Sequence, residues 1–464
     1  MKRDFCRISL DNQDLELYNT FVRLNGRLSS VRGGLRTLWV TVAFTVATHQ
    51  GFSEAEHVPA GVSSGTVRAA AVRTSGWRGD GTGCFPACRP PTEWSEGRNL
   101  LWRTRTGSSY SSPVLFGDRL FVMAEPDRLV ALSAIDGRLL WERTSRVEDL
   151  PEDARPKETP RKIKTDCGNT TPTPVTDGRN VYVSLNSGIV AAYDLDGGRK
   201  WIRLLDLPPS TAHGRSASPV LAGGLLIVHI SHLHALDPET GDVKWQTPDA
   251  VETYGTPAIA TIGGKEVLVT PKGDVVRVSD GAILASGVGA LSYASPVVRG
   301  RMVYFVDALS VALELPEEMK EKIEVKERWF TELEGEFFAS PVLHDGLLFA
   351  VSAVSNYYVL DAETGKTVLS RTPLDLAPAG AVDAEGTSVY ASVTFAGKNI
   401  FLCNNKGATL VLEAGGEYKE VGRGSLADGS AATPVFGGDR MYVRAGDFVC
   451  CIGRPGAPSG EAPR

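Results

Sequence analysis

The chain has 464 residues, of which 42% are hydrophobic and 22% are charged. This composition supplies enough apolar material for a large core and excludes a wholly disordered protein. The net charge of −6 comes from acids and bases mixed along the sequence, which excludes the basic footprint of a nucleic-acid-binding protein.

The N-terminal region has the features of a secretory signal. Arg32 and Arg36 precede an apolar run over residues 38–47, which is too short to span a bilayer. The alternative is a disordered leader or a wrongly assigned start. We expect residues 1–75 to be a signal or leader region, partly disordered, and the protein to be periplasmic or otherwise exported. No cysteine follows the apolar run, so we expect neither a lipid anchor nor a membrane span.

A short phrase then recurs eight times: a small hydroxyl residue, a proline, an apolar residue and a glycine turn. The seven full copies begin at Ser112, Thr173, Ser218, Thr256, Ser295, Ser340 and Thr433, and a worn copy lies at Ala381-Val382. The prolines from Pro113 to Pro434 are spaced by about 46 residues on average, which is the length of one propeller blade.

After each phrase comes a second β-prone triplet. The eight triplets start at Leu120, Val181, Leu226, Val267, Val303, Leu348, Val389 and Met441. Branched and aromatic residues favour a buried pleated surface, and the intervening glycines favour hairpin turns. The pattern predicts two antiparallel strands at the start of every repeat, with proline at the strand opening, where it costs no ladder bond.

Each repeat continues into a third strand, a turn and a fourth strand. The clearest copy is Ala235-x-Asp237-x-x-Thr240-Gly241-x-x-x-Trp245. This run resembles the tryptophan-docking motif of the quinoprotein-like (PQQ-like) propeller repeats, and the resemblance covers about residues 76–453. WD40 and kelch repeats lack this combination. The fourth strands of the first seven repeats end at Trp141, Trp201, Trp245, Ala285, Trp329, Leu369 and Val421.

The last repeat lacks a fourth strand, and a spare strand precedes the first repeat. Residues 448–453 end the last repeat, whereas Asn99-Leu100-Leu101-Trp102-Arg103 has the pattern of a fourth strand. Pairing the two would remove both free sheet edges. We therefore predict an all-β fold, an eight-bladed propeller of four-stranded antiparallel blades closed by an N-to-C strand clasp, over residues 76–453. We expect residues 454–464 to be a disordered tail.

Two insertions interrupt the repeats. Arg146 to Lys164 mixes charges and prolines, which predicts a solvated excursion between blades one and two. Residues 316–322 could form a short surface helix inside blade five.

Six cysteines follow the leader region. Cys84 and Cys88 are close enough in sequence for a disulfide, which an exported protein would permit, although pairing cannot be read from spacing. A zinc site needs further ligands that this pair lacks. We expect Cys167 and Cys403 to be small buried apolar residues.

The resemblance raises the question of whether the chain carries the redox site of this family. Quinoprotein dehydrogenases of this family hold pyrroloquinoline quinone at the propeller centre with calcium, an aspartate base and often a vicinal disulfide in an early blade. Cys450-Cys451 is vicinal but lies in the last blade, and adjacent residues of a strand point to opposite faces. We therefore expect two independent thiols.

One histidine cluster raises the question of a metal site. His232 and His234 would share a strand face, with His229 nearby, but no carboxylate or cysteine is interleaved before Asp237, which belongs to a turn. We expect polar hairpin residues. The sequence assigns no catalytic, cofactor-binding or metal-binding residue and no cofactor.

Repetition without long catalytic insertions favours an interaction platform. We expect an exported, non-catalytic propeller that binds a protein or glycan partner of the cell envelope and is itself a monomer. The alternative is a PQQ-dependent quinoprotein dehydrogenase acting on an alcohol or sugar. Outer-membrane assembly factors of the Bam complex have a similar fold, but their lipid-attachment motif is missing here.

Overall fold

The computed structural model describes residues 75–157, 166–207, 213–251, 254–376 and 387–455. All of these residues belong to one compact unit that spans 72–464. The predicted signal region, apart from Ser75, lies outside the described residues, as does the chain beyond residue 455. Within the described ranges, no helix has the length and hydrophobicity of a membrane span.

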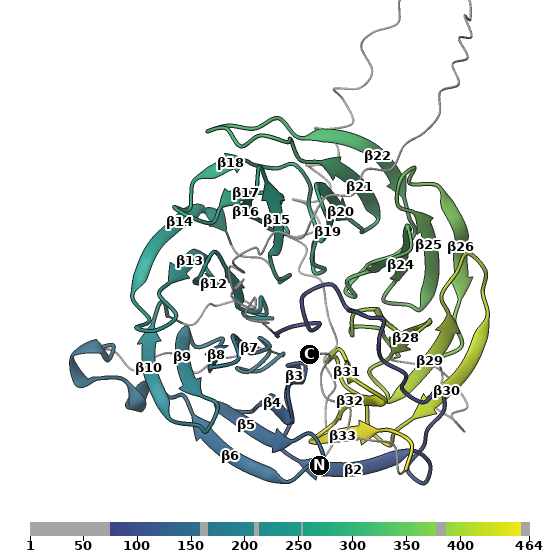
Figure 1. Cartoon of the computed structure of the whole chain (residues 1–464), viewed down its shortest axis with the longest axis horizontal. Helices are drawn as coiled ribbons and strands as arrows, with labels where there is room; N and C mark the ends of the chain where they lie inside the picture. Colours follow the sequence, from purple (N-terminus) through teal and green to yellow (C-terminus); the bar gives the residue numbers. More distant parts are fainter. Residues whose placement is uncertain (1–74, 158–165, 208–212, 252–253, 377–386, 456–464) are drawn as a thin grey trace, which may run out of the picture. The chain divides into compact units, whose positions relative to one another are not determined.

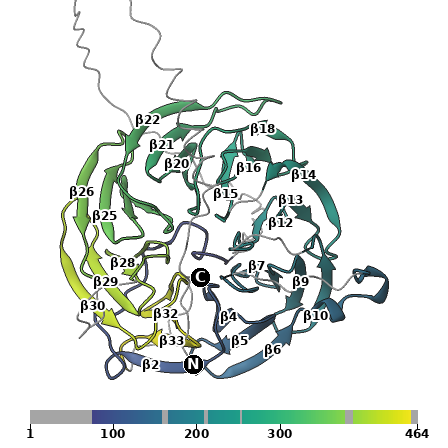
Figure 2. The ribbon, with the colours of Figure 1, turned by 180° about the vertical axis from the view of Figure 1, so that it is seen from behind.

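These residues form eight blades around a central channel (Figure 1, and from behind in Figure 2). In each blade the first strand is innermost and the fourth is outermost, and neighbouring strands are antiparallel. Blades one to four comprise β3 (Val114–Phe116), β4 (Arg119–Ala124), β5 (Arg128–Ser133) and β6 (Leu139–Thr144); β7 (Val175–Thr176), β8 (Asn180–Ser184), β9 (Ile189–Asp194) and β10 (Arg199–Leu204); β11 (Val220–Ala222), β12 (Leu225–Ile230), β13 (His232–Leu236) and β14 (Val243–Val251); β15 (Ala258–Ile262), β16 (Lys265–Val269), β17 (Val275–Arg277) and β18 (Ile283–Ala285).

The other four blades complete the ring. They comprise β19 (Val297–Arg299), β20 (Met302–Phe305), β21 (Leu309–Glu314) and β22 (Lys326–Glu332); β23 (Val342–His344), β24 (Leu347–Val351), β25 (Asn356–Asp361) and β26 (Thr367–Pro373); β27 (Thr394–Ala396), β28 (Asn399–Cys403), β29 (Ala408–Glu413) and β30 (Glu420–Ser425), with β1 (Cys84–Phe85) added beside β27; β31 (Val435–Gly437), β32 (Arg440–Ala445) and β33 (Phe448–Ile452), with β2 (Leu100–Arg105) as the fourth strand. The predicted clasp is confirmed, because β2 pairs with β33 from Leu100 opposite Ile452 to Arg105 opposite Phe448.

The core lies between adjacent blades. One cluster joins Phe121 and Ala131 of blade one to Val183 and Tyr193 of blade two, and all four side chains are buried. Alternating residues of each middle strand face the two neighbouring blades, so a strand with branched and aromatic residues on both faces is stable only inside such a stack.

Tryptophans cover five of these seams at the outer edge, and in four of them the indole N–H also forms a hydrogen bond; the fifth is Trp102, which packs on Gly137 of blade one. The indole N–H of Trp141, Trp201, Trp245 and Trp329 donates to a backbone carbonyl in the following blade at 2.8–2.9 Å. The ring packs against a turn glycine of that blade. A Cβ on Gly365, for example, would lie 2.6 Å from the ring of Trp329, and the φ of +71° there also favours glycine. Trp141, Trp201 and Trp329 are buried, whereas Trp102 and Trp245 are half-buried.

Blades four, six and seven lack this tryptophan, and in blades four and seven other residues take its place. Trp94, which precedes the ring in sequence, is 4% exposed, stacks on Phe401 and bridges to Gly424 of β30. At blade four, the insertion of blade five takes this place, since the Ile323 N–H donates to the Leu284 carbonyl at 3.0 Å. The helix predicted over residues 316–322 is wrong, because this insertion runs irregularly along the short outer strand β18.

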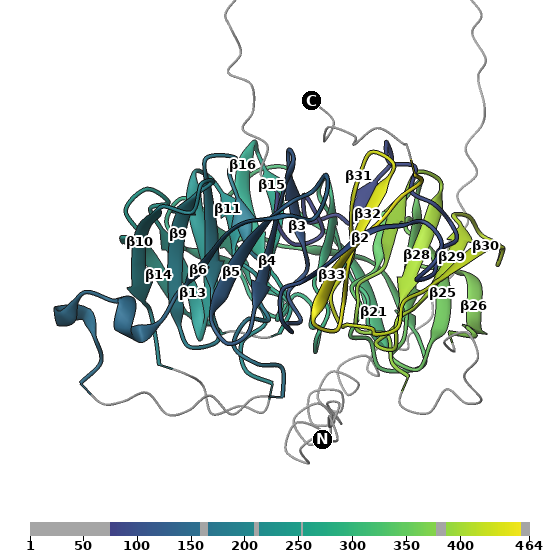
Figure 3. The same cartoon turned by 90° about the horizontal axis from the view of Figure 1, so that it is seen from below.

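The insertion between blades one and two contains two short 3-10 helices, η1 (Val147–Asp149) and η2 (Glu152–Ala154), before residues 158–165, which lie outside the described residues. It projects from the rim beside β10 (Figure 3).

A closed ring of eight hydrogen bonds joins the blades around the channel. In every blade, the backbone N–H of the hydroxyl residue before the first strand donates to the hydroxyl of the equivalent residue in the next blade, at 2.8–3.1 Å. In order, these residues are Ser112, Thr173, Ser218, Thr256, Ser295, Ser340, Ser392 and Thr433, which donates back to Ser112. We call this set the hydroxyl ring. It explains why the repeated phrase requires serine or threonine.

The hydroxyl ring corrects the sequence prediction for blade seven. The predicted copy at Ala381-Val382 lies outside the described residues, and the ring position is Ser392, followed by β27. The triplet Val389-Tyr390-Ala391 is therefore not a second strand. The worn copy was misplaced because blade seven keeps the hydroxyl but has lost the proline.

We expect Ser392→Ala to lower the free energy of unfolding by about 1–3 kcal/mol, because it leaves the buried N–H of Ser340 without an acceptor. Urea unfolding measures this loss. Ser392→Thr is the matched control and should behave like the native chain, since threonine holds three of the eight ring positions. An alanine variant as stable as the threonine variant would contradict the role of the ring.

Candidate functional site

A segment that precedes the first blade closes one end of the channel. Residues 75–99, which we call the strap, cross the centre of the ring (dark purple in Figure 1). Ser75 bridges to Thr176 of β7, and β1 pairs in parallel with β27. The strap therefore contacts the first strands of the blades. It lies on the side of the hydroxyl ring toward which these strands run.

Arg78 fixes the strap at the centre. Its side chain is 2% exposed, and Nη2 donates to the carbonyls of Pro341 and Val393 at 2.7 and 3.0 Å. Burial lowers the pKa of the guanidinium to about 10. Gly83 covers the guanidinium so closely that a Cβ there would lie 2.5 Å from Nη2. Strap and blades are thus packed together at this end.

A cavity of about 140 Å³ remains between the strap and blades two to five. Its lining is mostly apolar and includes Trp77, Ile259 and Val298, with Asp80 as the charged residue. Asp80 accepts hydrogen bonds from the Thr82 backbone and hydroxyl. Small-molecule sites usually enclose about 300–1,000 Å³, so this space is too small for a tricyclic cofactor.

Aromatic side chains line the opposite mouth. The residues two positions before the hydroxyl ring are Tyr110, Thr171, Ser216, Tyr254, Tyr293, Phe338, Tyr390 and Ala431. In blades four to seven these positions form a continuous row, with ring centroids 5.3, 4.5 and 5.1 Å apart, and His213 adds an edge contact to Tyr254 at 5.6 Å. We call His213, Tyr254, Tyr293, Phe338 and Tyr390 the aromatic collar. All five are half-buried.

Two carboxylates stand next to the collar at blades five and six. Asp307, in the turn between β20 and β21, accepts hydrogen bonds from the backbone N–H groups of Ala308 (2.8 Å) and Ser292 (3.4 Å), and Ser292 directly precedes Tyr293. Burial raises the pKa of Asp307. Burial also raises the pKa of Glu336, and the charge of Asp307 raises it further. Among the described residues, neither carboxylate forms an ion pair with a cation.

The histidine cluster lies on the β12–β13 hairpin of blade three. The rings of His232 and His234 stack at 4.2 Å on one face of β13, as predicted. His229 and His234 contact backbone carbonyls at 3.1 Å, and burial lowers the pKa of each to about 4. No group of three or more His, Cys, Asp or Glu side chains in the described part of the chain could hold a metal ion.

The vicinal cysteines Cys450 and Cys451 are separated in the core. Cys450 and Cys451 belong to different core clusters on opposite faces of β33, and burial raises the pKa of both to about 12. The prediction of two independent thiols agrees with this arrangement. Cys84 and Cys88 are both free, so no disulfide links them.

The predictions of burial for the other two cysteines have different outcomes. Cys403 is buried as expected, whereas the prediction for Cys167 is wrong, because it lies half-buried in the insertion between blades one and two.

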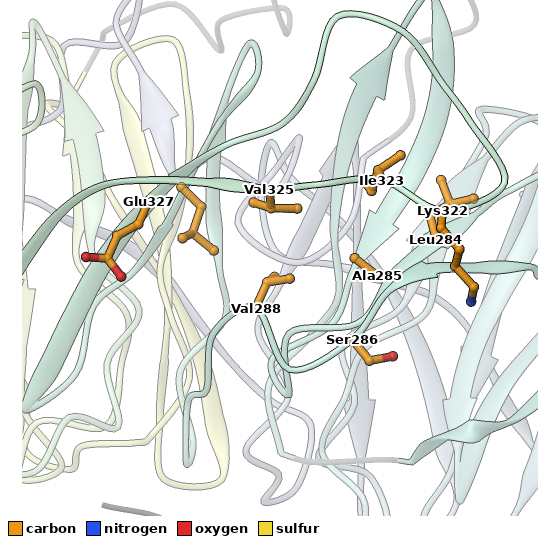
Figure 4. Close-up of a pocket in the computed structure, with 9 residues that line it drawn as sticks. Leu284, Ala285, Ser286, Val288, Lys322, Ile323, Val325 and Glu327 are labelled. Atoms are coloured by element: carbon orange, nitrogen blue, oxygen red, sulfur yellow. The ribbon is translucent and has the colours of Figure 1, made fainter. Parts of the chain in front are cut away.

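A shallow groove lies at the rim between blades four and five (Figure 4). Its apolar floor comprises Ala285, Val288, Ile323 and Val325, flanked by Lys322 and Glu327. The insertion of blade five forms one wall of the groove. We interpret the groove as part of the contact between blades four and five, where the insertion takes the place of a tryptophan.

Residues 94–315 match the family described as "Outer membrane protein assembly factor BamB". The matched repeats are therefore of the PQQ-like type, and the fold is a β-propeller. This propeller is similar to BamB from Moraxella catarrhalis, with 13% identity and a TM-score of 0.55 over 77% of this chain and 98% of that chain. A comparison with curated protein sequences gave no match.

Two further structures resemble the propeller about equally well. The quinohemoprotein alcohol dehydrogenase ADHIIG from Pseudomonas putida HK5 has 13% identity and a TM-score of 0.51, covering 82% of this chain and 80% of that chain. The computationally designed Ika8 protein has 11% identity and a TM-score of 0.52, covering 78% and 99%. An assembly factor, an enzyme and a designed protein share this fold, so the fold alone does not decide function.

Proposed function

We propose that this chain is an exported, non-catalytic binding module, and that the channel mouth bearing the aromatic collar contacts a protein or glycan partner of the cell envelope. The observation that best supports this proposal is that the strap closes one end of the channel, while the aromatic collar at the other end is half-buried. Exposed aromatic side chains on a rigid scaffold are typical of binding surfaces.

The residues of the channel do not fit a quinone cofactor. The strap fills the channel centre with Arg78 and Gly83, and the remaining cavity holds about 140 Å³. Asp307 and Glu336, next to the collar, would repel the carboxylates of pyrroloquinoline quinone. We therefore derive no redox step for this chain.

Export rests on the predicted signal and on the family described as an outer membrane assembly factor. We also propose that the protein is a monomer in isolation, since each blade, including the clasped last one, is complete within the chain.

The rival function, a quinone-dependent dehydrogenase, is favoured by the similarity to an alcohol dehydrogenase. Purified protein mixed with pyrroloquinoline quinone and calcium should neither bind the quinone stoichiometrically nor reduce a dye when an alcohol or sugar is added. Absorbance after gel filtration and a dye-linked assay measure the two properties. Stoichiometric quinone with substrate-dependent dye reduction would overturn the binding-module proposal.

The binding function itself is tested in the native envelope. Tagged native chain should retain its partner through crosslinking and purification, and the double variant Tyr293→Ala with Phe338→Ala should lose it. Phe330→Ala is the matched control, because Phe330 is 52% exposed on β22 but lies outside the collar. Equal recovery with the collar variant, at equal thermal stability, would contradict the proposed surface.

A further inference from the structure

The collar has a corner at blades five and six where two rings meet at an angle. Tyr293 and Phe338 have centroids 4.5 Å apart and an interplanar angle of 56°, and Tyr254 extends the row by stacking on Tyr293 at 5.3 Å and 17°. Tilted rings expose parts of their faces, which carry the negative end of the ring quadrupole. The ring faces therefore give the corner a negative electrostatic potential, although the rings themselves are apolar.

Carboxylates add formal charge at the same corner. Asp307 is 9% exposed and accepts a hydrogen bond from the backbone N–H of Ser292 at 3.4 Å, directly before Tyr293, and Glu336 precedes Phe338 by two residues. Glu334, two residues earlier, already pairs with Arg371. Among the described residues, no cation pairs with Asp307 or Glu336, so a cation supplied by a partner would find two carboxylates that form no ion pair within this part of the chain.

We propose that this corner receives a basic side chain, arginine or lysine, from the partner protein. This inference rests on the proposed binding function and names the chemistry that the partner presents. A cation over the ring faces gains cation–π attraction, and it compensates the two carboxylates in a partly desolvated site. A neutral sugar would gain no such charge term, and an anion would be repelled.

The probe is a short capped peptide with one arginine among glycines, and its partner probe carries citrulline instead. Citrulline keeps the length and planar end of arginine but is neutral, so the comparison isolates the charge. Titration of the full chain, followed by calorimetry or by intrinsic fluorescence, should show that the arginine peptide binds at least about tenfold more tightly than the citrulline peptide. Choline is titrated in parallel as a cation without a peptide.

Variants locate the site. Glu336→Gln and Phe338→Ala should each weaken binding of the arginine peptide by about fivefold or more, without changing binding of the citrulline peptide by the same factor. Glu334→Gln is the matched control and should bind like the native chain, because Glu334 is exposed and paired elsewhere. Near-ultraviolet circular dichroism verifies that each variant is folded, and the comparison of peptides on the native chain requires no variant.

Equal affinity for the arginine and citrulline peptides would overturn the proposal, as would tighter binding of choline than of the arginine peptide. If the peptides fail while the native partner is still lost from the collar double variant, the basic side chain is wrong and the binding surface stands. If the partner is also retained by that variant, the proposed binding surface fails as well.

Discussion

Replacing Trp329 with alanine is expected to lower the free energy of unfolding by about 3–5 kcal/mol, the usual cost of emptying a large aromatic site. Trp329 is 7% exposed, donates its indole N–H to the Ala362 carbonyl at 2.9 Å and packs on Gly365 of the next blade. The variant therefore loses apolar contact and leaves a carbonyl without its donor. Chemical unfolding followed by circular dichroism measures the change.

Two controls test whether docking between blades is the cause. Trp245→Ala should cost less, because Trp245 is half-buried although it makes the same type of hydrogen bond, to the Val278 carbonyl. Phe330→Ala, next to Trp329 on β22, should change stability by no more than about 0.5 kcal/mol, because its ring is 52% exposed. A Trp329 variant no less stable than the Phe330 variant would show that the seams do not depend on tryptophan docking.

The blade repeats could be predicted from sequence because each blade is specified by local chemistry. Asp237 accepts backbone hydrogen bonds from Glu239 and Thr240, and Gly241 supplies the positive φ of that turn. Such turns recur at fixed offsets, so counting them also revealed the strand missing from one end and present at the other.

The failures occurred where contacts between blades override local pattern. The acidic and basic run over 316–322 has good helix propensity, but the Leu284 carbonyl and the Ile283 carbonyl bond to Ile323 and Lys322 and hold the insertion along β18. In blade seven the proline signal was absent, and the hydroxyl alone marks the position.

The residues of the candidate site were not predicted from the sequence, although one part of the site has a sequence signal. The collar has a sequence signal, an aromatic residue followed by a small residue and then by the ring hydroxyl, as in Tyr254-Gly255-Thr256 and Tyr293-Ala294-Ser295. This signal is weaker than the proline after the hydroxyl, because three of the eight repeats have no aromatic residue at the position. The proximity of Asp307 and Glu336 has no such signal, since they come from loops of different kinds in neighbouring blades.

The second large effect is loss of stability in mild acid through His229. Burial lowers the pKa of this imidazole to about 4, against an ordinary value of 6.5. Between those values the unfolded chain binds a proton that the folded chain does not, so stability is complete above pH 6.5 and is lost as the pH falls toward 4. The shift corresponds to about 3 kcal/mol at the lower end, and His234, with a similarly lowered pKa, acts in the same direction.

His229→Phe isolates this contribution. The phenyl ring cannot bind a proton, so unfolding free energy measured by urea titration should fall less steeply between pH 7 and pH 4.5 than in the native chain, with a difference of about 2–3 kcal/mol across that range. At pH 7.5 the variant should be less stable than the native chain, since the Ala250 carbonyl loses its contact with Nε2. The raised pKa of Asp307 stabilises the folded state on acidification, but it is common to both proteins and cancels in the comparison. Parallel pH profiles for the two proteins would mean that His229 is already protonated or solvated in the folded chain, and that the β12–β13 hairpin of blade three opens more readily than its packing implies.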